Sequence, residues 1–241
     1  MDFTGKNIVI TGAASGIGKC LAQEFSSKGA LVIVIDKDKI DVQVDFFFRG
    51  DIAAEEVLRE FVQAVLAKYG KIDYLINNAA LSKKGILSQC SYEDFLYVQK
   101  VNVVAPYMLS MLFLPHFNEK AAIVNISSSR FKMSQPDTES YSASKGGITA
   151  LTHALAVSLA GKVRVNSVAP GWIDNIGEEL SEADLLQNPV GRVGKPIDIA
   201  KMVMFLCHQD SGFINGENIT VDGGVSKQMI YHGEYGWEYR V

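Results

Sequence analysis

Cysteine is scarce in this sequence, and its pattern fits neither a metal site nor a disulfide framework. The 241 residues include Cys20, Cys90 and Cys207, an odd number with no CxxC or Cys/His ligand spacing. Scattered cysteines of this kind are typical of reduced thiols in a cytoplasmic protein. We therefore expect no metal, a cytoplasmic location and a packing role for all three.

Basic stretches and long apolar runs are missing as well. The formal net charge of −4 provides no positive field for nucleic acid phosphates. The most apolar stretch, 101–117, is interrupted by Asn102, Pro106 and His116 and is too short to span a bilayer. The opening residues, MDFTGKNIVITG, lack the pattern of a signal peptide. We expect neither nucleic acid nor a membrane as a partner.

The sequence does contain a regular alternation of β-branched runs and helical patterns. Seven runs are apolar throughout, as strands covered on both faces should be, at Asn7–Thr11, Leu31–Ile35, Phe46–Phe48, Tyr74–Asn77, Ala122–Ile126, Arg164–Ala169 and Asn218–Val221. Helices are predicted between them, at Gly16–Lys28, Ala54–Tyr69, Tyr92–Asn118 with a break at Pro106, Tyr141–Leu159 and Ile197–Cys207.

This order of elements predicts an α/β fold, a single Rossmann-like domain with a doubly wound, seven-stranded parallel sheet. Only residues 37–44 separate the second and third strands, so the crossover helix usual at that place is missing or reduced to a turn. No linker, internal repeat or low-complexity tract divides the chain.

A glycine-rich turn directly follows the first strand. Residues 11–18 read TGAASGIG at the point where a helix begins. Small residues let the backbone approach a pyrophosphate, and a helix N-terminus offers free amides and the positive end of its dipole. Glycines also serve ordinary tight turns, but this position between strand and helix favours dinucleotide binding.

Two acidic residues at strand ends fit the same ligand. Asp36 lies about 20 residues past the turn, where a carboxylate can accept hydrogen bonds from the adenosine ribose. Its charge would repel a 2′-phosphate, which favours NAD over NADP, although Lys37 and Lys39 partly offset that repulsion. Asp51, after the third strand, either lies beside adenine or caps the helix that follows.

A tyrosine and a lysine stand four residues apart in the segment YSASK, residues 141–145. This spacing puts Tyr141 and Lys145 on one face of a helix, one turn apart. The pKa of tyrosine is normally about 10, so the phenol accepts protons poorly at neutral pH unless a positive charge lowers it. Lys145 is placed to supply such a charge.

Together these motifs resemble the short-chain dehydrogenase/reductase family. The resemblance covers nearly the whole chain, and its most specific part is the spacing of Tyr141 and Lys145. The motifs come in the family's order: the turn at 11–18, NNAA at 77–80, Asn102, NISS at 125–128, YSASK at 141–145 and Pro170–Gly171.

The resemblance implies a role for each catalytic residue. Tyr141 corresponds to the family's general acid/base, and Lys145 to the lysine that binds the nicotinamide ribose and lowers the tyrosine pKa. Ser128, thirteen residues before Tyr141, corresponds to the serine that hydrogen-bonds the substrate oxygen. Asn102 corresponds to an asparagine that holds a water in a proton relay to the lysine; from the residues alone it also fits a capped or kinked helix position.

Cofactor contacts are implied along the same edge of the sheet. The family often has threonine at the position of Asn175, which leaves the contact of this amide open. The expected cofactor-binding residues are Gly12, Ser15, Gly16, Ile17, Gly18, Asp36, Asp51, Ile52, Asn78, Ala79, Ala80, Tyr141, Lys145, Pro170, Gly171 and Ile173.

The expected reaction transfers a hydride between a nicotinamide cofactor, with NAD favoured, and a small secondary alcohol or ketone such as a sugar, polyol or hydroxy acid. One alternative is a non-catalytic dinucleotide-binding regulatory protein, and another is a 3-ketoacyl-thioester reductase. Asp36 and a short acidic loop after Gly171 disfavour the reductase. Lys83, Lys84 and Arg130 either receive an anionic or polyol substrate or are simply solvated.

Two segments suggest contacts beyond this core. The apolar helical patterns at 103–114 and 148–159 carry more apolar surface than one sheet face covers, and the family pairs these helices, so we expect a homodimer or homotetramer. The C-terminal tail, 225–241, closes the substrate pocket, docks on a neighbouring subunit or packs on its own subunit. It is aromatic at Tyr231, Tyr235, Trp237 and Tyr239, beside His232.

Overall fold

The computed structural model describes residues 1–234 and 236–238, and its centre is one parallel sheet of seven strands. The strand order is β3-β2-β1-β4-β5-β6-β7, which confirms the predicted doubly wound sheet. Each neighbouring pair is parallel. The strands are β1 (Asn7–Thr11), β2 (Leu31–Asp36), β3 (Phe46–Arg49), β4 (Ile72–Asn77), β5 (Phe117–Ile126), β6 (Val163–Pro170) and β7 (Asn218–Val221).

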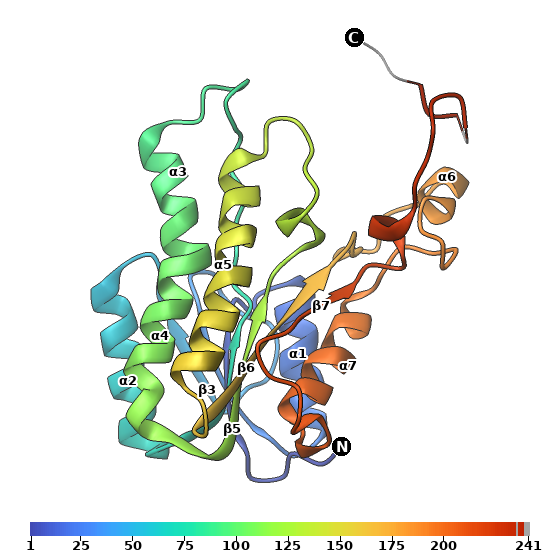
Figure 1. Cartoon of the computed structure of the whole chain (residues 1–241). Coiled ribbons are helices and arrows are strands. Elements are labelled where there is room, and N and C mark those ends of the chain that lie inside the picture. The colour runs from blue at the N-terminus through green and yellow to red at the C-terminus, as the bar shows by residue number, and fades with distance from the viewer. Residues whose placement is uncertain (235, 239–241) are drawn as a thin grey trace.

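Helices cover both faces of this sheet (Figure 1). The helices α1 (Gly16–Ser27) and α7 (Pro196–Cys207) pack with one apolar cluster. The helices α2 (Glu55–Tyr69), α4 (Ala105–Phe113) and α5 (Glu139–Ser158) pack with the other. Burial on two faces explains why the central strands are rich in apolar residues.

The connection between β2 and β3 contains no helix, as predicted from its length. Ile40, Val42 and Val44 lie on this connection, and all three pack against the cluster that contains α1. Their alternation places successive apolar side chains on the same side of an extended segment. A short loop therefore covers the sheet where a crossover helix would otherwise lie.

The helical region after β4 differs from the prediction. The helix α3 (Tyr92–Gln99) continues into a π-helical turn, Lys100–Val104, before α4 begins, so the irregularity precedes Pro106. Pro106 has no N–H to donate to the carbonyl of Asn102, which explains why the α-helical pattern yields at this place. The helix ends before Asn118, because β5 begins at Phe117.

The loop after β6 carries a short helix, α6 (Glu182–Leu186), which the sequence pattern did not predict. Ser181 and Asp184 form a capping box at its start. The remaining helical elements are 3₁₀ turns at Leu114–His116, Ser129–Phe131, Gln209–Ser211 and Val225–Lys227.

The C-terminal tail leads away from the body of the subunit (Figure 1). Tyr231 and Trp237 remain 61% and 46% exposed, so the tail near them does not pack on its own subunit. Val225 and Ser226, at the start of the tail, are half-buried. His232 and Trp237 form a T-shaped contact with each other, at 6.1 Å between ring centroids. Tyr235 and Tyr239 lie outside the described residues.

Within the described residues, none of the helices has the length and apolar character needed to cross a bilayer. The same part of the chain holds no group of three or more His, Cys, Asp or Glu side chains that could bind a metal ion. Cys20, Cys90 and Cys207 are free, and Cys207 is fully buried.

Candidate active site

A cleft of about 510 Å³ lies at the carboxyl ends of the parallel strands. It spans the two sides of β1, where successive crossovers reverse direction and ligands of doubly wound sheets bind. The cleft brings together most of the predicted site residues: Gly12, Ser15, Gly16, Ile17, Asp36, Asp51, Ile52, Asn78, Ala79, Ala80, Ser128, Tyr141, Lys145, Pro170, Gly171 and Ile173. Gly18 and Asn102 are the two predicted residues that do not line it.

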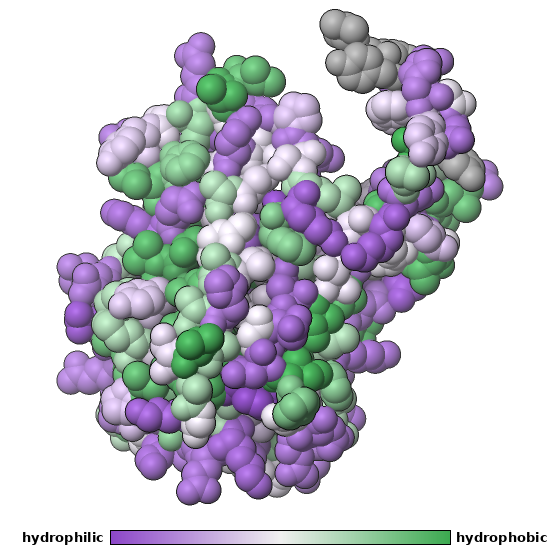
Figure 2. Space-filling view, in the orientation of Figure 1, coloured by the Kyte–Doolittle hydropathy of each residue, from purple (hydrophilic) through white to green (hydrophobic). Residues whose placement is uncertain are grey.

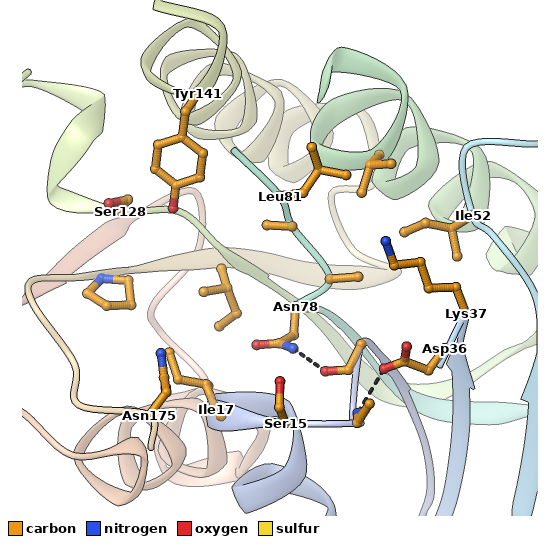
Figure 3. A pocket seen from close by; sticks show the side chains of 18 of the residues that line it. Ser15, Ile17, Asp36, Lys37, Ile52, Asn78, Leu81, Ser128, Tyr141 and Asn175 are labelled. Atoms are coloured by element: carbon orange, nitrogen blue, oxygen red, sulfur yellow. Dashed lines mark hydrogen bonds between the residues drawn. The ribbon is translucent and has the colours of Figure 1, made fainter. Parts of the chain in front are cut away.

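The glycine turn is held too tightly for larger residues. A Cβ at Gly12 would lie 2.7 Å from the Cα of Ala79, and a Cβ at Gly18 would lie 1.8 Å from the carbonyl oxygen of Gly12. The Asn78 amide nitrogen donates to that carbonyl at 2.7 Å (Figure 3). Gly18 therefore has a packing role beneath the turn, whereas Gly12 lets the backbone form the floor of the cleft.

The start of α1 is open towards the cleft. Ser15 occupies the N-cap position, but its side chain makes no capping hydrogen bond. A Cβ at Gly16 would lie 2.8 Å from the Asn175 side-chain oxygen, which places Asn175 against this helix end. The first amides of a helix and its dipole attract an anion, so this end of the cleft suits a pyrophosphate.

Asp36 is fixed by backbone amides on either side. Its carboxylate accepts a hydrogen bond from the amide of Ala14 at 2.8 Å (Figure 3) and another from the amide of Asp38 at 3.0 Å. Two amide contacts leave carboxylate lone pairs free for ribose hydroxyls. The negative charge thus stands at a defined point beside the glycine turn.

Asp51 has a partner that sequence reasoning missed. The hydroxyl of Tyr97, on α3, donates a hydrogen bond to the Asp51 carboxylate at 2.7 Å, and both residues line the cleft. Burial and this carboxylate raise the pKa of Tyr97 to about 12. The two residues are 46 positions apart, so no local pattern could indicate the contact. Asp51 also accepts from the amide of Ala53 at 2.9 Å. The N-cap position of α2 is Ala54, without a side-chain cap, so the alternative that Asp51 caps this helix is not found.

Tyr141 and Ser128 face each other across the other end of the cleft (Figure 3). Tyr141 lies in the first turn of α5, and Ser128 follows β5. Burial raises the pKa of Tyr141, while its hydrogen bond with Ser128 and the charge of Arg130 act in the opposite direction. The expected net lowering of this pKa is not found for the chain alone, because burial outweighs the groups that oppose it.

Lys145 is buried one helical turn after Tyr141. Its ammonium nitrogen donates to the carbonyl of Ile126 at 2.8 Å and lies 5.3 Å from the centre of the Tyr141 ring. Burial lowers the pKa of Lys145 to about 7. The lysine is therefore poised between its charged and neutral forms near neutral pH.

Asn102 joins the segments around the tyrosine but does not line the cleft. Its buried side-chain amide donates to the carbonyl of Leu81 and to the hydroxyl of Ser144, each at 2.9 Å. Its side-chain oxygen accepts from the amide of Leu81 at 3.0 Å. These contacts tie the π-helical turn to α5 and to the segment after β4.

Several cleft residues had no place in the sequence-based site. Lys37 extends into the cleft beyond Asp36 (Figure 3), and Trp172 follows the predicted pair Pro170–Gly171. Trp172 is 37% exposed and adjoins both this cleft and a second hollow beside it. In the sequence, Lys37 directly follows Asp36 and Trp172 directly follows Gly171, and this adjacency was the signal that could have placed them in the cleft. Asn175, whose contact was left open by the sequence, also lines the cleft. The residues newly found in the lining are Ala14, Ile35, Lys37, Asp38, Gly50, Leu81, Tyr97, Val101, Ile126, Ser127 and Trp172.

Comparison with protein families and curated relatives gives matches over almost the whole chain. A family model described as enoyl-(acyl carrier protein) reductase matches residues 12–226. An uncharacterized oxidoreductase from Thermotoga maritima is 37% identical, over 94% of this chain and 98% of that protein. A 3-oxoacyl-(acyl-carrier-protein) reductase from the same organism is 34% identical, over 93% and 99% of the two chains. A meso-2,3-butanediol dehydrogenase from Serratia marcescens is 32% identical, over 94% and 96%.

Solved structures with the same architecture also match almost the whole chain. An apo SCOR enzyme from Clostridium thermocellum is 44% identical, with a TM-score of 0.90 over 98% of this chain and 99% of that one. The aldohexose dehydrogenase of Thermoplasma acidophilum is 26% identical, with a TM-score of 0.89 over 96% and 98%.

Proposed function

This chain belongs to the short-chain dehydrogenase/reductase family of NAD(P)-dependent oxidoreductases acting on CH–OH groups, and from that premise we propose that it interconverts a small secondary alcohol and its ketone with NAD. The observation that carries the proposal is the convergence of Tyr141, Ser128 and Lys145 at one end of a cleft whose other end is a glycine turn. This convergence supports turnover over the alternative of a non-catalytic dinucleotide-binding protein.

The residues of the cleft fit a dinucleotide from end to end. The uncapped start of α1 suits the pyrophosphate, the Asp36 carboxylate suits the adenosine ribose, and Asp51 lies at the adenine side. The charge of Asp36 disfavours a 2′-phosphate, which supports NAD over NADP. When bound, the nicotinamide supplies the hydride donor or acceptor.

Tyr141 and Ser128 perform the proton chemistry in this proposal. The Tyr141 hydroxyl exchanges the proton of the substrate oxygen, and the Ser128 hydroxyl hydrogen-bonds and orients that oxygen. Lys145 holds positive charge against the tyrosine when protonated. Asn102 does not line the cleft; it fixes Ser144 and the turn at 100–104 by hydrogen bonds. We place the water of a proton relay to Lys145 at this turn.

Reduction of a 3-ketoacyl thioester is the second candidate, because the 3-oxoacyl-(acyl-carrier-protein) reductase is among the relatives. Two features favour a small substrate over it. Asp36 disfavours the phosphorylated cofactor that biosynthetic reductions usually use, and the loop after β6 is short, with only the five-residue helix α6.

We further propose a homodimer or homotetramer of single-domain subunits in the cytoplasm. The side of the subunit formed by α4 and α5 carries exposed apolar side chains (Figure 2). They include Tyr107 and Met111 on α4, Val157 on α5 and Val104 just before α4. Apolar side chains gathered on one face favour association. Light scattering at micromolar concentration tests this, and a monomer there would contradict it.

The test of the activity is a panel of sugars, polyols, hydroxy acids and simple secondary alcohols, followed by the absorbance of the reduced cofactor with NAD⁺ or NADP⁺. Tyr141→Phe should bind the cofactor normally but lose about 10²- to 10⁴-fold in turnover, since it lacks the acid/base. Tyr92→Phe, an exposed tyrosine at the start of α3, is the matched control. Near-normal turnover in Tyr141→Phe would refute the proposed role.

A further inference from the structure

A second hollow, of about 710 Å³, adjoins the reacting end of the cleft. It shares Ser128, Tyr141, Gly171 and Trp172 with the first cleft, so it begins where the substrate oxygen is proposed to bind. The rest of a substrate must extend into this hollow. Its lining therefore decides which substrates fit.

Arg130 and Asp184 are the charged residues among those that line the hollow. The Asp184 carboxylate is engaged in the capping box of α6, where it accepts from the Ser181 amide at 2.9 Å and from its hydroxyl at 2.7 Å. These bonds fix the carboxylate at the start of α6 without removing its charge. Arg130 is the cation among the residues that line the hollow, and so the group that an anionic ligand would meet.

The half-buried Arg130 guanidinium is fixed by neutral groups. It donates to the Thr138 hydroxyl at 3.2 Å and to the Gln135 side-chain oxygen. Across residues 1–234 and 236–238, no ion pair of Arg130 with a carboxylate is found. A guanidinium has five N–H donors, so Arg130 keeps donors and a full charge for a ligand.

The position of Arg130 is coupled to the reacting residues. Its backbone amide donates to the Ser128 hydroxyl oxygen at 3.2 Å, and its charge reaches the Tyr141 phenol and opposes the rise in that group's pKa. A group bound by the guanidinium would lie within a small molecule's length of the substrate oxygen.

The other nearby cations do not share this position. Lys83 forms an ion pair with Asp94 at 3.1 Å, and neither Lys83 nor Lys84 lines the hollow. The Asp174 carboxylate accepts hydrogen bonds from the amides of residues 176–178 and does not line the hollow. Among the residues that line the hollow, Arg130 is therefore the cation available to an anionic group.

We propose that Arg130 binds an oxyanion group of the substrate, a carboxylate or a phosphate, so that the enzyme acts on small hydroxy acids or hydroxyalkyl phosphates and their keto forms. Arginine matches such groups because two parallel N–H donors face two oxygens. This inference rests on the proposed dehydrogenase function and specifies its substrate class.

The test compares anionic substrates with neutral analogues that keep the secondary hydroxyl and lack the anionic group. The pairs are 3-hydroxybutyrate and 3-hydroxybutyramide, lactate and lactamide, and glycerol 3-phosphate and glycerol. For the wild type, the anion of at least one pair should have the higher kcat/KM. In Arg130→Gln that preference should fall about ten- to a hundredfold, the value of a hydrogen-bonded charge contact. Whether carboxylates or the phosphate respond identifies the oxyanion.

The decisive readout is the ratio of kcat/KM for the anion to kcat/KM for its neutral partner. If Arg130→Gln only disturbed the positions of Ser128 or Tyr141, it would lower kcat/KM equally for both members of a pair. The ratio would then stay unchanged, and this result would overturn the inference. Arg130→Lys should keep part of the preference, because it keeps the charge but not the paired donors. Arg59→Gln, an exposed arginine of α2 paired with Glu55, is the control.

A binding measurement covers the case in which no member of the panel is turned over. The same carboxylates and phosphate are titrated into the enzyme with NADH, and the NADH fluorescence is followed. Saturable binding in the millimolar range that is lost in Arg130→Gln supports the inference, and absence of saturable binding overturns it. The Tyr141→Phe test judges the proposed function separately, since it does not depend on the anion preference.

Discussion

The Lys145 ammonium nitrogen lies 5.3 Å from the centre of the Tyr141 ring and is buried with the carbonyl of Ile126 as its hydrogen-bond acceptor. Burial brings the pKa of this lysine from 10.5 to about 7. Between these values the unfolded chain holds a proton that the folded chain has released. The burial of Lys145 therefore lowers the free energy of unfolding most below pH 7, and the free energy of unfolding should rise as the pH increases above 7.

Lys145→Met tests this linkage by removing the titrating group. The variant should have a higher Tm than the wild type at pH 6.5, by at least a few degrees, and the difference should shrink towards pH 10. Thermal unfolding without cofactor measures it, with the exposed Lys201→Met on α7 as the control. A constant difference across this range would show that Lys145 is not deprotonated on folding.

Asp36 should determine the choice between cofactors. Asp36→Asn removes the charge that repels a 2′-phosphate, while the amide oxygen can still accept from the backbone. We expect the ratio of kcat/KM for NADP to that for NAD to rise about tenfold or more. Asp38→Asn, a neighbouring acid that also lines the cleft, is the matched control. Equal changes in both variants would mean that general charge, not the position of Asp36, sets the preference.

Tyr97 should support cofactor binding through Asp51. Tyr97→Phe removes the donor at 2.7 Å and leaves the carboxylate free to turn. The Kd for NAD should rise about threefold to tenfold, the value of one hydrogen bond, with little change in kcat at saturation. Nicotinamide hypoxanthine dinucleotide, which lacks the adenine amino group, should show a smaller effect. Equal losses for both dinucleotides would argue against a contact between Asp51 and adenine.

Two glycines in helices should respond to alanine in opposite ways. In Gly18→Ala the new Cβ would meet the Gly12 carbonyl oxygen at 1.8 Å, so the turn must shift and we expect a loss of about 1–3 kcal/mol in unfolding free energy. In Gly146→Ala the Cβ has open space within α5, and a gain of about 0.5–1 kcal/mol is expected. Urea titration of both variants checks the pair, and a neutral Gly18→Ala would contradict the packing role.

Local patterns were sufficient for the sheet and for the reacting residues. The strands were visible because burial on both faces favours runs rich in apolar and β-branched residues, and the seven runs recur as β1–β7. Tyr141 and Lys145 were visible because one helical turn relates them, and Ser128 because its distance from Tyr141 resembles that in the family. The structure brings these three residues into one cleft.

Long-range relationships could not be predicted in the same way. The contact of Tyr97 with Asp51 and the support of Arg130 by Gln135 and Thr138 depend on how the loops pack. The helix predicted to reach Asn118 ends early because pairing with Ile72 of β4 extends β5 back to Phe117. Gly18 has the spacing of a ligand-binding glycine, and its close packing beneath the turn could not be read from that spacing.

The π-helical turn at Lys100–Val104 differs from an unbroken α-helix by a single extra residue. One residue more or fewer at this place rotates everything beyond it by about 100°. Deleting Val104 would therefore turn either Asn102 away from Ser144 or the buried Leu109 and Phe113 of α4 away from the core. A fall in Tm together with loss of turnover would show that this one residue keeps the reacting end of the cleft and the core in register.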